Sequence, residues 1–255
     1  MSQEERALAF GALHRKGVPV VLYNIWDAGS AQCVAEAGAK ALATGSWSVA
    51  AAHGYGDGQK LPLPLLLETV REIVAATDLP LSVDFEGAYS EDPAQAAANV
   101  AQVIDAGGIG INFEDQMVGR GGVHPIDKQA ARIRAIREMA ERQGIALFIN
   151  ARTDLFLQES DAARHAALME DAIARAEAMR RGASGFFAPG LAHRDLIARL
   201  CAASPLPVNV MMKPGAPDIA TLAAAGVGRV SYGPFPYREM IARLRGEAEK
   251  VYRAS

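Results

Sequence analysis

The chain has 255 residues and a formal net charge of −3, with 50% hydrophobic and 22% charged residues. Such a length can bury a large core, and the small net charge gives no electrostatic reason to expect nucleic acid or an anionic membrane as partner. No signal peptide and no bilayer-spanning apolar run are present, which predicts a cytoplasmic protein. Cys33 and Cys201 lie in helical patterns and are expected to be buried, as in a reducing compartment.

Short apolar runs alternate along the chain with longer helical patterns rich in Ala, Leu, Arg and Glu. The apolar runs that we predict to be strands are residues 18–24, 39–46, 79–86, 108–115, 145–153, 183–190, 206–212 and 228–234. A helical pattern separates each strand from the next, one more helix is predicted over residues 2–16, and a last helix follows the final strand.

Eight strands that each precede a helix predict a (β/α)8 barrel, formed by residues 1–255 as a single domain. Continuous apolar runs are typical of parallel strands that are covered on both faces. The alternative is a doubly wound open sheet. The barrel is preferred because the alternation reaches eight strands without interruption.

In such a barrel the functional site lies at the carboxyl ends of the strands. Asp84 and Glu86 end the third predicted strand and, two residues apart, should share one face; Glu114 ends the neighbouring strand, and Asp57 lies in the preceding loop. Carboxylates without His or Cys suit Mg²⁺ or Mn²⁺. Each acid alone could instead cap a helix or pair with a surface arginine, but their convergence favours a metal site.

Other polar residues at the strand ends suggest what the metal would help to bind. Arg152 ends the fifth strand and can bind a carboxylate through two hydrogen bonds, and Asn209 on the seventh strand is a further candidate for substrate binding. A cation beside an arginine predicts a receptor for a small 2-oxo acid. Asp27 is expected to cap a helix and Asp115 to pair with a basic residue.

The histidines show no metal-ligand spacing. His14, His165 and His193 are expected to face solvent on helices.

Several stretches resemble, in the same order, the isocitrate lyase/phosphoenolpyruvate mutase superfamily. They are YNIWDAGSAQCVAEAGAKALATGSWSVAAAHGYGDGQKLP, LSVDFEGAY, GINFEDQ, INARTD, PVNVM and GVGRVSYGP. The resemblance implies a (β/α)8 barrel with Mg²⁺ and with 2-oxo acid or enolpyruvate-type ligands. It also implies a homodimer or homotetramer in which the last helix is exchanged between subunits.

The resemblance further implies a role for individual residues. Asp84 matches the direct Mg²⁺ ligand, and Arg152 matches the clamp on the substrate carboxylate. Ser46 and Trp47 match a stretch whose backbone N–H groups bind that carboxylate. In the family, other acids hold the metal's water molecules, and the residues that match them here are Glu86, Glu114 and Asp57.

The loop after the fourth strand, EDQMVGRGGVHPIDKQAARI, departs from the family pattern. It lacks the cysteine of the family's lyases and is shorter than the loop of the phosphonate-handling members, which use a Lys and an Asn. We expect residues 117–127 to form a mobile lid, in which Arg120 or His124 takes over the missing catalytic role.

The sequence thus predicts a Mg²⁺-dependent enzyme that acts on a small 2-oxo acid through an enolate, with carbon–carbon lyase or decarboxylase chemistry as first choice. The second choice is a carbon–phosphorus mutase or hydrolase acting on a phosphonate, with Asp57 as nucleophile or water activator. The third is a 2-oxo acid binding protein without turnover.

Overall fold

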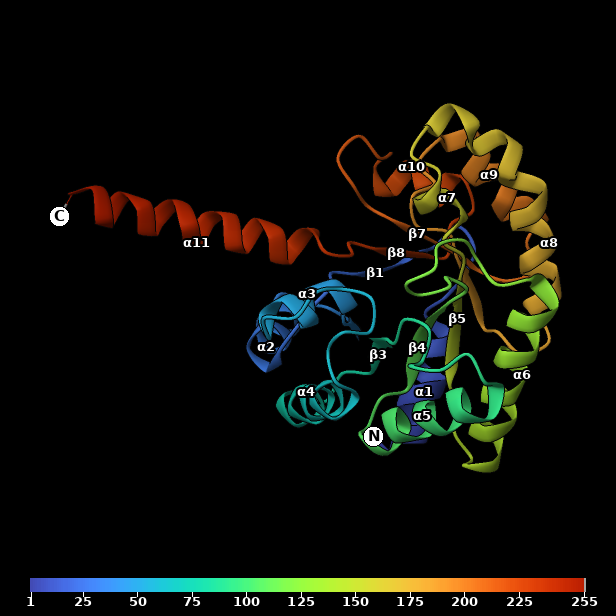
Figure 1. Cartoon of the computed structure of the whole chain (residues 1–255), viewed down its shortest axis with the longest axis horizontal. Helices are drawn as coiled ribbons and strands as arrows, with labels where there is room; N and C mark the ends of the chain where they lie inside the picture. Colours follow the sequence, from blue (N-terminus) through green and yellow to red (C-terminus); the bar gives the residue numbers. More distant parts are fainter. Residues whose placement is uncertain (255) are drawn as a thin grey trace.

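The computed structural model describes residues 1–254 and arranges eight parallel strands as a barrel surrounded by helices (Figure 1). The strands are β1 (Val20–Leu22), β2 (Leu42–Ala43), β3 (Leu81–Asp84), β4 (Gly110–Glu114), β5 (Phe148–Arg152), β6 (Gly185–Phe187), β7 (Val208–Met211) and β8 (Arg229–Ser231). The sheet runs from β1 through β8 to β2, and a parallel bridge between Ile25 and Thr44 joins its two edges. The predicted barrel is confirmed, and the open-sheet alternative is wrong.

A helix follows every strand, and most of the helices cover the outside of the barrel. They are α1 (Gln3–Ala12), α2 (Ala28–Glu36), α3 (Ser46–Ala52), α4 (Leu63–Ala76), α5 (Pro93–Asp105), α6 (Ile126–Arg142), α7 (Leu155–Gln158), the 3-10 helix η1 (Ala162–Leu168), α8 (Met169–Met179), α9 (Arg194–Ala203), α10 (Ile219–Ala224) and α11 (Phe235–Ala254). Asp27 caps α2 by accepting a hydrogen bond from the N–H of Ser30, as predicted.

Alternate residues of each strand face the helices or the barrel interior. The helix-facing residues are apolar and fully buried, as Val83, Ile111 and Ile149 illustrate. Burial of one such side chain contributes about 1.5–3 kcal/mol to stability. The interior-facing set instead includes Asn112 and Asn150, which are buried and hydrogen-bonded to each other. The barrel therefore combines an apolar outer layer with a polar interior beneath its mouth.

Helix α1 closes the barrel at the amino ends of the strands. Phe10 packs edge-on against Phe148 at 5.3 Å between ring centroids, and His14 stacks on the same ring at 3.8 Å. The prediction that His14 faces solvent is therefore wrong, and burial lowers the pKa of its imidazole to about 3. An amphipathic pattern on a short helix cannot reveal that the helix plugs a barrel end.

Solvent exposure was predicted for two further histidines and burial for the two cysteines, and the structure confirms one prediction of each kind. His165 is buried against Phe156 rather than exposed, whereas His193 is exposed as expected. Cys201 is buried as expected, but Cys33 is exposed on α2.

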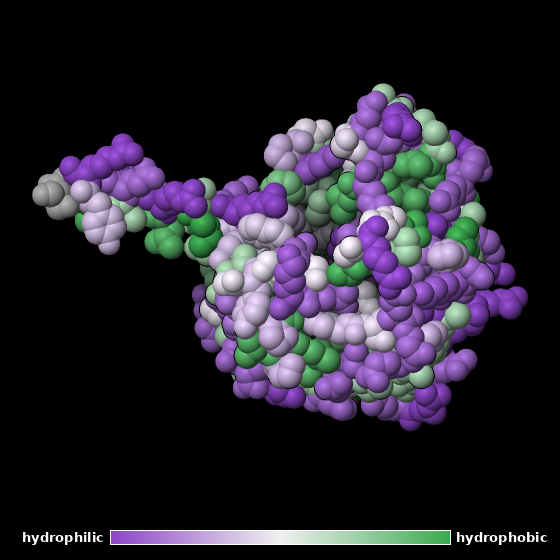
Figure 2. All heavy atoms as spheres, viewed as in Figure 1, coloured by the Kyte–Doolittle hydropathy of each residue, from purple (hydrophilic) through white to green (hydrophobic). Residues whose placement is uncertain are grey.

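Helix α11 extends away from the barrel instead of covering it (Figure 1). Apolar side chains gather along one side of this helix, which Figure 2 shows in green, and Met240 and Leu244 are among its exposed residues. The outer face of β1 is left uncovered, so Val21 and Tyr23 are partly exposed. Although α11 has 20 residues, no helix within residues 1–254 is long and apolar enough to cross a membrane.

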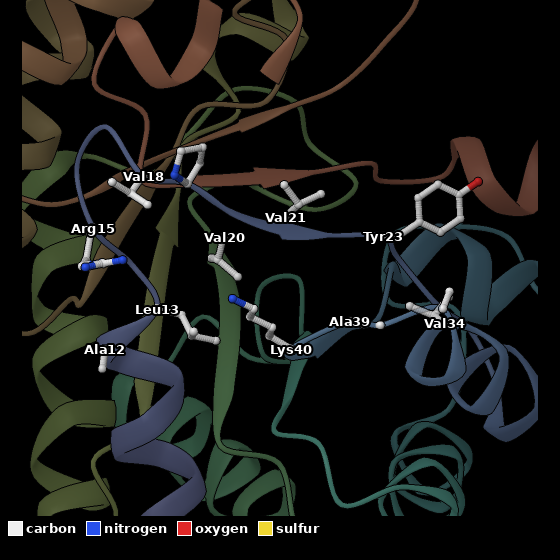
Figure 3. Close-up of a pocket in the computed structure, with 13 residues that line it drawn as sticks. Ala12, Leu13, Arg15, Val18, Val20, Val21, Tyr23, Val34, Ala39 and Lys40 are labelled. Atoms are coloured by element: carbon white, nitrogen blue, oxygen red, sulfur yellow. The ribbon is translucent and has the colours of Figure 1, made fainter. Parts of the chain in front are cut away.

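A groove of about 460 Å³ lies beside the uncovered outer face of β1. Val18 and Val21 from the β1 segment and Val34 and Ala39 from the α2 region line its apolar part (Figure 3). Lys40 and Arg15 contribute its polar part. This groove faces outward and is separate from the cavity at the barrel mouth.

Candidate active site

A cavity of about 270 Å³ opens at the carboxyl ends of the strands. Five residues that the sequence predicted for the site line it, and they are Ser46, Trp47, Asp57, Asp84 and Arg152. The strand ends, Leu157 of α7 and the first turn of α11 supply the rest of the wall. The structure therefore brings the predicted residues of four different segments to one cavity.

Asp84 is the last residue of β3 and has its carboxylate held by two donors. The N–H of Ser46 donates to Oδ2 at 2.9 Å, and the amide nitrogen of Asn112 lies 3.4 Å from Oδ1. The N–H of Asp84 itself donates to the hydroxyl of Thr44. These contacts fix the carboxylate at the floor of the cavity. They also use the Ser46 N–H, which the family resemblance had suggested for a substrate carboxylate.

Glu86 is not among the residues that line the cavity, and its backbone differs from the one that strand alternation predicted. Strand β3 ends at Asp84, and Glu86 has a φ of 49°, so the prediction that the two residues share a strand face is wrong. Ala88 and Tyr89 also have positive φ, a conformation that costs about 1–3 kcal/mol per residue. The N–H of Gln59 donates to Glu86 Oε2 at 2.7 Å and holds the side chain in this turn.

Arg132 supports the strained turn from below. Its Nη2 donates to the carbonyl oxygens of Gly87 and Ser90, at 2.7 Å each, and its guanidinium lies over the ring of Phe113. A buried arginine with two carbonyl partners offsets part of the strain. Strain of this kind next to a cavity is typical of functional sites.

Arg152 ends β5 and contacts three acids. Its Nε and Nη2 donate to the two carboxylate oxygens of Asp154, at 2.6 and 3.0 Å. Its Nη1 lies 3.0 Å from Glu114 Oε2 and 3.8 Å from Asp84 Oδ1. One edge of the guanidinium is thus held by Asp154, while Nη1 lies between the acids that the sequence assigned to the metal.

The acids at this site repel one another in a place that excludes water. Burial, and then the charges of Asp57 and Asp84, raise the pKa of Glu86 to about 8. Burial raises the pKa of Glu114 well above its usual value, although Arg152 opposes the shift. Asp57 lies at the rim with its side chain partly exposed, and loss of water and the charge of Asp84 raise its pKa. Added positive charge at this point would stabilise all of these carboxylates.

The lid residues lie outside the cavity. Arg120 is exposed and forms an ion pair with Glu91, which also pairs with Lys128 at 2.8 Å. His124 is buried beside a separate cavity of about 250 Å³, and burial, followed by the charge of Arg132, lowers its pKa. Neither side chain lines the barrel-mouth cavity in this arrangement of the loop.

Asp115 and Asn209 are also away from the cavity wall. Asp115 is fully buried, pairs with Arg175 at 3.0 Å, and accepts the N–H of Asp154, which confirms the expectation of a basic partner. Asn209 lies inside the barrel, where its amide nitrogen donates to the carbonyl oxygens of Val210 and Arg229.

The first turn of α11 contributes residues that the sequence did not suggest. Phe235 and Arg238 line the cavity, and the guanidinium of Arg238 lies 4.4 Å from the ring centroid of Trp47. Tyr237 packs edge-on against Trp26 and Trp47. In the sequence these residues are an ordinary helix start, and none of them was predicted for the site.

Comparisons with known proteins identify relatives of this chain. A solved protein of Burkholderia cenocepacia J2315, described as a candidate phosphonomutase, is 46% identical; the match covers 98% of this chain and 99% of that one, with a TM-score of 0.95. An uncharacterized protein of Mycobacterium tuberculosis (strain ATCC 25618 / H37Rv) is 34% identical over 90% of this chain and 83% of its own length. The 2-methylisocitrate lyase of Bacillus subtilis (strain 168) is 26% identical over 83% of this chain and 68% of its own.

The family model that matches is that of phosphoenolpyruvate phosphomutase, and it covers residues 10–252. This range includes every strand, the acid cluster and the first turn of α11. The resemblance seen in the sequence is therefore confirmed, and the chain belongs to the phosphoenolpyruvate phosphomutase family within the phosphoenolpyruvate mutase/isocitrate lyase superfamily.

Proposed function

We propose that this protein is a Mg²⁺-dependent enzyme that breaks or forms a bond next to the carbonyl of a small 2-oxo acid, through an enolate. The observation that carries the proposal is the crowding of carboxylates around Asp84. Burial and mutual repulsion raise the pKa of Asp57, Glu86 and Glu114 although Arg152 opposes the shift, so the site can accommodate further positive charge. A divalent cation would supply that charge.

Within residues 1–254, no three Asp, Glu, His or Cys side chains converge closely enough to ligate one ion directly, so the expected convergence of the acids on a single ion is not found. The proposal therefore gives Mg²⁺ one direct protein ligand, because this ion keeps several of its water molecules and takes few carboxylates. Asp84 would hold the ion directly, and Glu86, Glu114 and Asp57 would hold its waters. When bound, the ion would stabilise negative charge on the enolate oxygen.

Arg152 is the group that would orient the substrate. Its bidentate contact with Asp154 fixes the plane of the guanidinium. Its Nη1 then lies at the cavity, next to Asp84, where it can donate to a substrate carboxylate. Once a cation neutralises Glu114 and Asp84, Nη1 becomes available for that carboxylate.

The cavity walls bear on the size and charge of the substrate. Leu157, Phe187 and Met211 form an apolar wall, and Arg238 supplies a second cation at the mouth. A cavity of about 270 Å³ suits a molecule of a few carbon atoms. A 2-oxo acid with a second anionic group could place one anion on Arg152 and the other near Arg238.

Carbon–carbon lyase or decarboxylase chemistry on such an acid is the first choice. Carbon–phosphorus chemistry is the second, and two observations favour it. Asp57 lines the cavity and is free to activate water or attack phosphorus, and the 46%-identical relative is a candidate phosphonomutase. The lid lacks the cysteine of the family's lyases, which weakens any assignment to isocitrate-type cleavage.

The test is a panel of oxaloacetate, pyruvate, a 2-alkylmalate and phosphonopyruvate, each with Mg²⁺ and with the metal removed by a chelator. Metal-dependent turnover of oxaloacetate or the alkylmalate supports the lyase proposal. Turnover of phosphonopyruvate alone supports carbon–phosphorus chemistry. Binding of the acids without turnover supports a binding protein, and absence of both binding and turnover refutes the proposal.

We also propose a homodimer or homotetramer in which α11 of one subunit covers the outer face of β1 in another. Helix α11 leaves the barrel with Met240 and Leu244 exposed. The groove beside Val18 and Val21 is the position at which the helix after β8 would complete the barrel's outer layer (Figure 3). An apolar helix side and an apolar groove, both uncovered in one copy, are complementary.

A further inference from the structure

A charged side chain lies in the middle of the barrel, below the cavity. Arg229 starts β8, is 1% exposed, and points into the interior. Within residues 1–254 it forms no ion pair, and its Nε and Nη1 have no hydrogen-bond partner. Arg229 contacts the site through one hydrogen bond, which its Nη2 donates to Oδ1 of Asn112 at 3.2 Å. A buried cation of this kind is costly and calls for a functional reason.

The contacts of Asn112 allow only one orientation of its amide. Oδ1 accepts from Arg229 and also from Nδ2 of Asn150, at 2.8 Å. A guanidinium has no acceptor, so the atom that faces it has to be the amide oxygen. Nδ2 of Asn112 is therefore turned the other way, toward Oδ1 of Asp84 at 3.4 Å.

Neighbouring groups hold this arrangement in place. Nδ2 of Asn150 also donates to Oδ1 of Asn209 at 3.0 Å, and Asn209 is fixed by two backbone carbonyl oxygens. Gly185 lies opposite Asn150 in the sheet, and a Cβ there would come within 2.9 Å of the Asn150 amide oxygen. The space left by Gly185 therefore accommodates the network.

We infer that Arg229 is a positioning residue for Asp84 and acts through the amide of Asn112. With Asn112 on Oδ1 and Ser46 on Oδ2, the Asp84 carboxylate is held from both sides. This inference rests on the proposed function, in which Asp84 is the direct metal ligand. It adds Arg229 to the residues that support the site and connects it to Asp84 through Asn112, which already contacts the carboxylate.

The charge of Arg229 supports the same role. Burial lowers its pKa to about 9, and the charge of Asp84 opposes this shift, so the guanidinium remains protonated at neutral pH. The nearby His14 is neutral, because burial and Arg229 lower its pKa to about 3. The charged guanidinium of Arg229 thus lies below the acid cluster and keeps its Nη2 donor on Oδ1 of Asn112.

A double-mutant cycle on Mn²⁺ affinity tests the inference. Arg229→Met removes the donors, Asn112→Leu removes the amide, and each should weaken Mn²⁺ binding by about tenfold. Because both act through one contact, the double variant should bind no more weakly than Asn112→Leu alone. A loss of about 100-fold in Mn²⁺ affinity in the double variant, the product of the two single losses, would refute the action of Arg229 through Asn112.

Arg137→Met is the matched control, since Arg137 is another mostly buried arginine whose donors hold the carbonyl oxygens of Gly182 and Leu147. It should lower stability without changing Mn²⁺ affinity, and an equal loss of affinity in Arg137→Met and Arg229→Met would refute the inference. If Arg229→Met does not fold, Arg229→Lys takes its place in the cycle and should weaken Mn²⁺ binding by about threefold. The double variant should again bind no more weakly than Asn112→Leu alone.

A second measurement does not depend on metal. The side-chain amide resonances of Asn112 in the metal-free protein, assigned by their absence in Asn112→Leu, should shift in Arg229→Met and stay unchanged in Arg137→Met. Unshifted resonances in Arg229→Met would refute the orientation of Asn112 by Arg229. A parent protein that binds no Mn²⁺ would refute the proposed metal function, and the amide resonances would then decide by themselves whether Arg229 orients Asn112.

Discussion

Asp154 holds Arg152 through two parallel hydrogen bonds, from Nε at 2.6 Å and from Nη2 at 3.0 Å. Both side chains are largely buried, and Asp154 is itself held through its N–H by Asp115. The plane of the guanidinium is therefore set before any ligand arrives. An arginine fixed in this way loses little conformational entropy on binding a carboxylate.

Replacement of Asp154 by Asn should weaken the binding of oxalate, a planar mimic of a pyruvate-type enolate. The substitution removes one charged hydrogen-bond partner of Arg152, so we expect a loss of about 1.5–3 kcal/mol in binding free energy, or roughly tenfold or more in Kd. Titration calorimetry measures this loss. Glu159→Gln, which removes the ion pair with the exposed Arg164, is the control and should leave the Kd unchanged. Equal oxalate affinity in Asp154→Asn and the parent would contradict the positioning of Arg152.

Replacement of Asp84 by Asn should abolish metal binding but not folding. Loss of a direct ligand should weaken Mn²⁺ binding by more than about 100-fold, because loss of an outer partner already costs about 10- to 100-fold. Titration calorimetry gives the affinity, and circular dichroism checks the fold. Asp78→Asn removes an exposed carboxylate elsewhere and should have no effect. Parental Mn²⁺ affinity in Asp84→Asn would assign the ion to another place.

The strands were predictable because a parallel barrel needs apolar residues on the helix-facing side of every strand. The positions of Asp84, Glu114 and Arg152 followed from the strand ends in the same way. Glu86 was expected on the same strand face as Asp84, but its φ of 49° takes it out of the strand, and it is not among the residues that line the cavity. No local pattern reveals a positive φ at a glutamate, because the conformation is imposed by contacts with Gln59.

Arg238 and the interior position of Arg229 could not be predicted from local sequence. Arg238 reaches the cavity because α11 starts at the barrel mouth before it leaves the barrel. Arg229 begins an apolar strand, where an arginine is usually expected to point to the solvent. Its burial depends on Asn112, Asn150 and Asn209, which come from three other strands. These residues meet only in the closed barrel, so no local sequence pattern indicates the network.

Stability at acid pH should depend on His14. Burial lowers the pKa of this imidazole to about 3 in the folded protein, from the ordinary value of 6.5 for a histidine. Between these values the unfolded chain binds a proton that the folded protein does not, so stability falls as the pH drops below 6.5. At about pH 5 the loss relative to neutral pH should be on the order of 2 kcal/mol.

His14→Phe should reduce this acid sensitivity, because phenylalanine can stack on Phe148 without titrating. Urea unfolding at several pH values measures the slope of the unfolding free energy. His193→Phe, at an exposed histidine, is the control and should retain the parental slope. A parental slope in His14→Phe would show that other groups cause the acid dependence.

Introduction of a charge on the apolar side of α11 should dissociate the proposed oligomer. Leu244→Glu would bury a carboxylate in the groove of the partner subunit, which is strongly unfavourable without a compensating cation. We expect light scattering after size exclusion to give a monomer mass for this variant. Ala242→Glu adds the same side chain at an exposed position on a different side of the helix and should preserve the oligomer. An unchanged mass for Leu244→Glu, or a monomeric parent, would contradict exchange of α11.

The last prediction concerns the lid, in which Gly119, Gly121 and Gly122 all have positive φ and Arg120 pairs with Glu91. Both partners of this pair are exposed, so the pair contributes about 0–1 kcal/mol and can be broken easily when the lid moves. If Arg120 acts on the substrate only in a closed lid, Arg120→Ala should lower kcat by roughly tenfold or more with little change in ligand affinity. Glu91→Gln releases Arg120 but leaves its charge, so kcat should be retained. Steady-state kinetics with an acid of the panel that the protein turns over gives kcat for Arg120→Ala and for Glu91→Gln. An equal fall of kcat in both variants would mean that the ion pair itself matters, and parental kcat in Arg120→Ala would exclude Arg120 from the reaction.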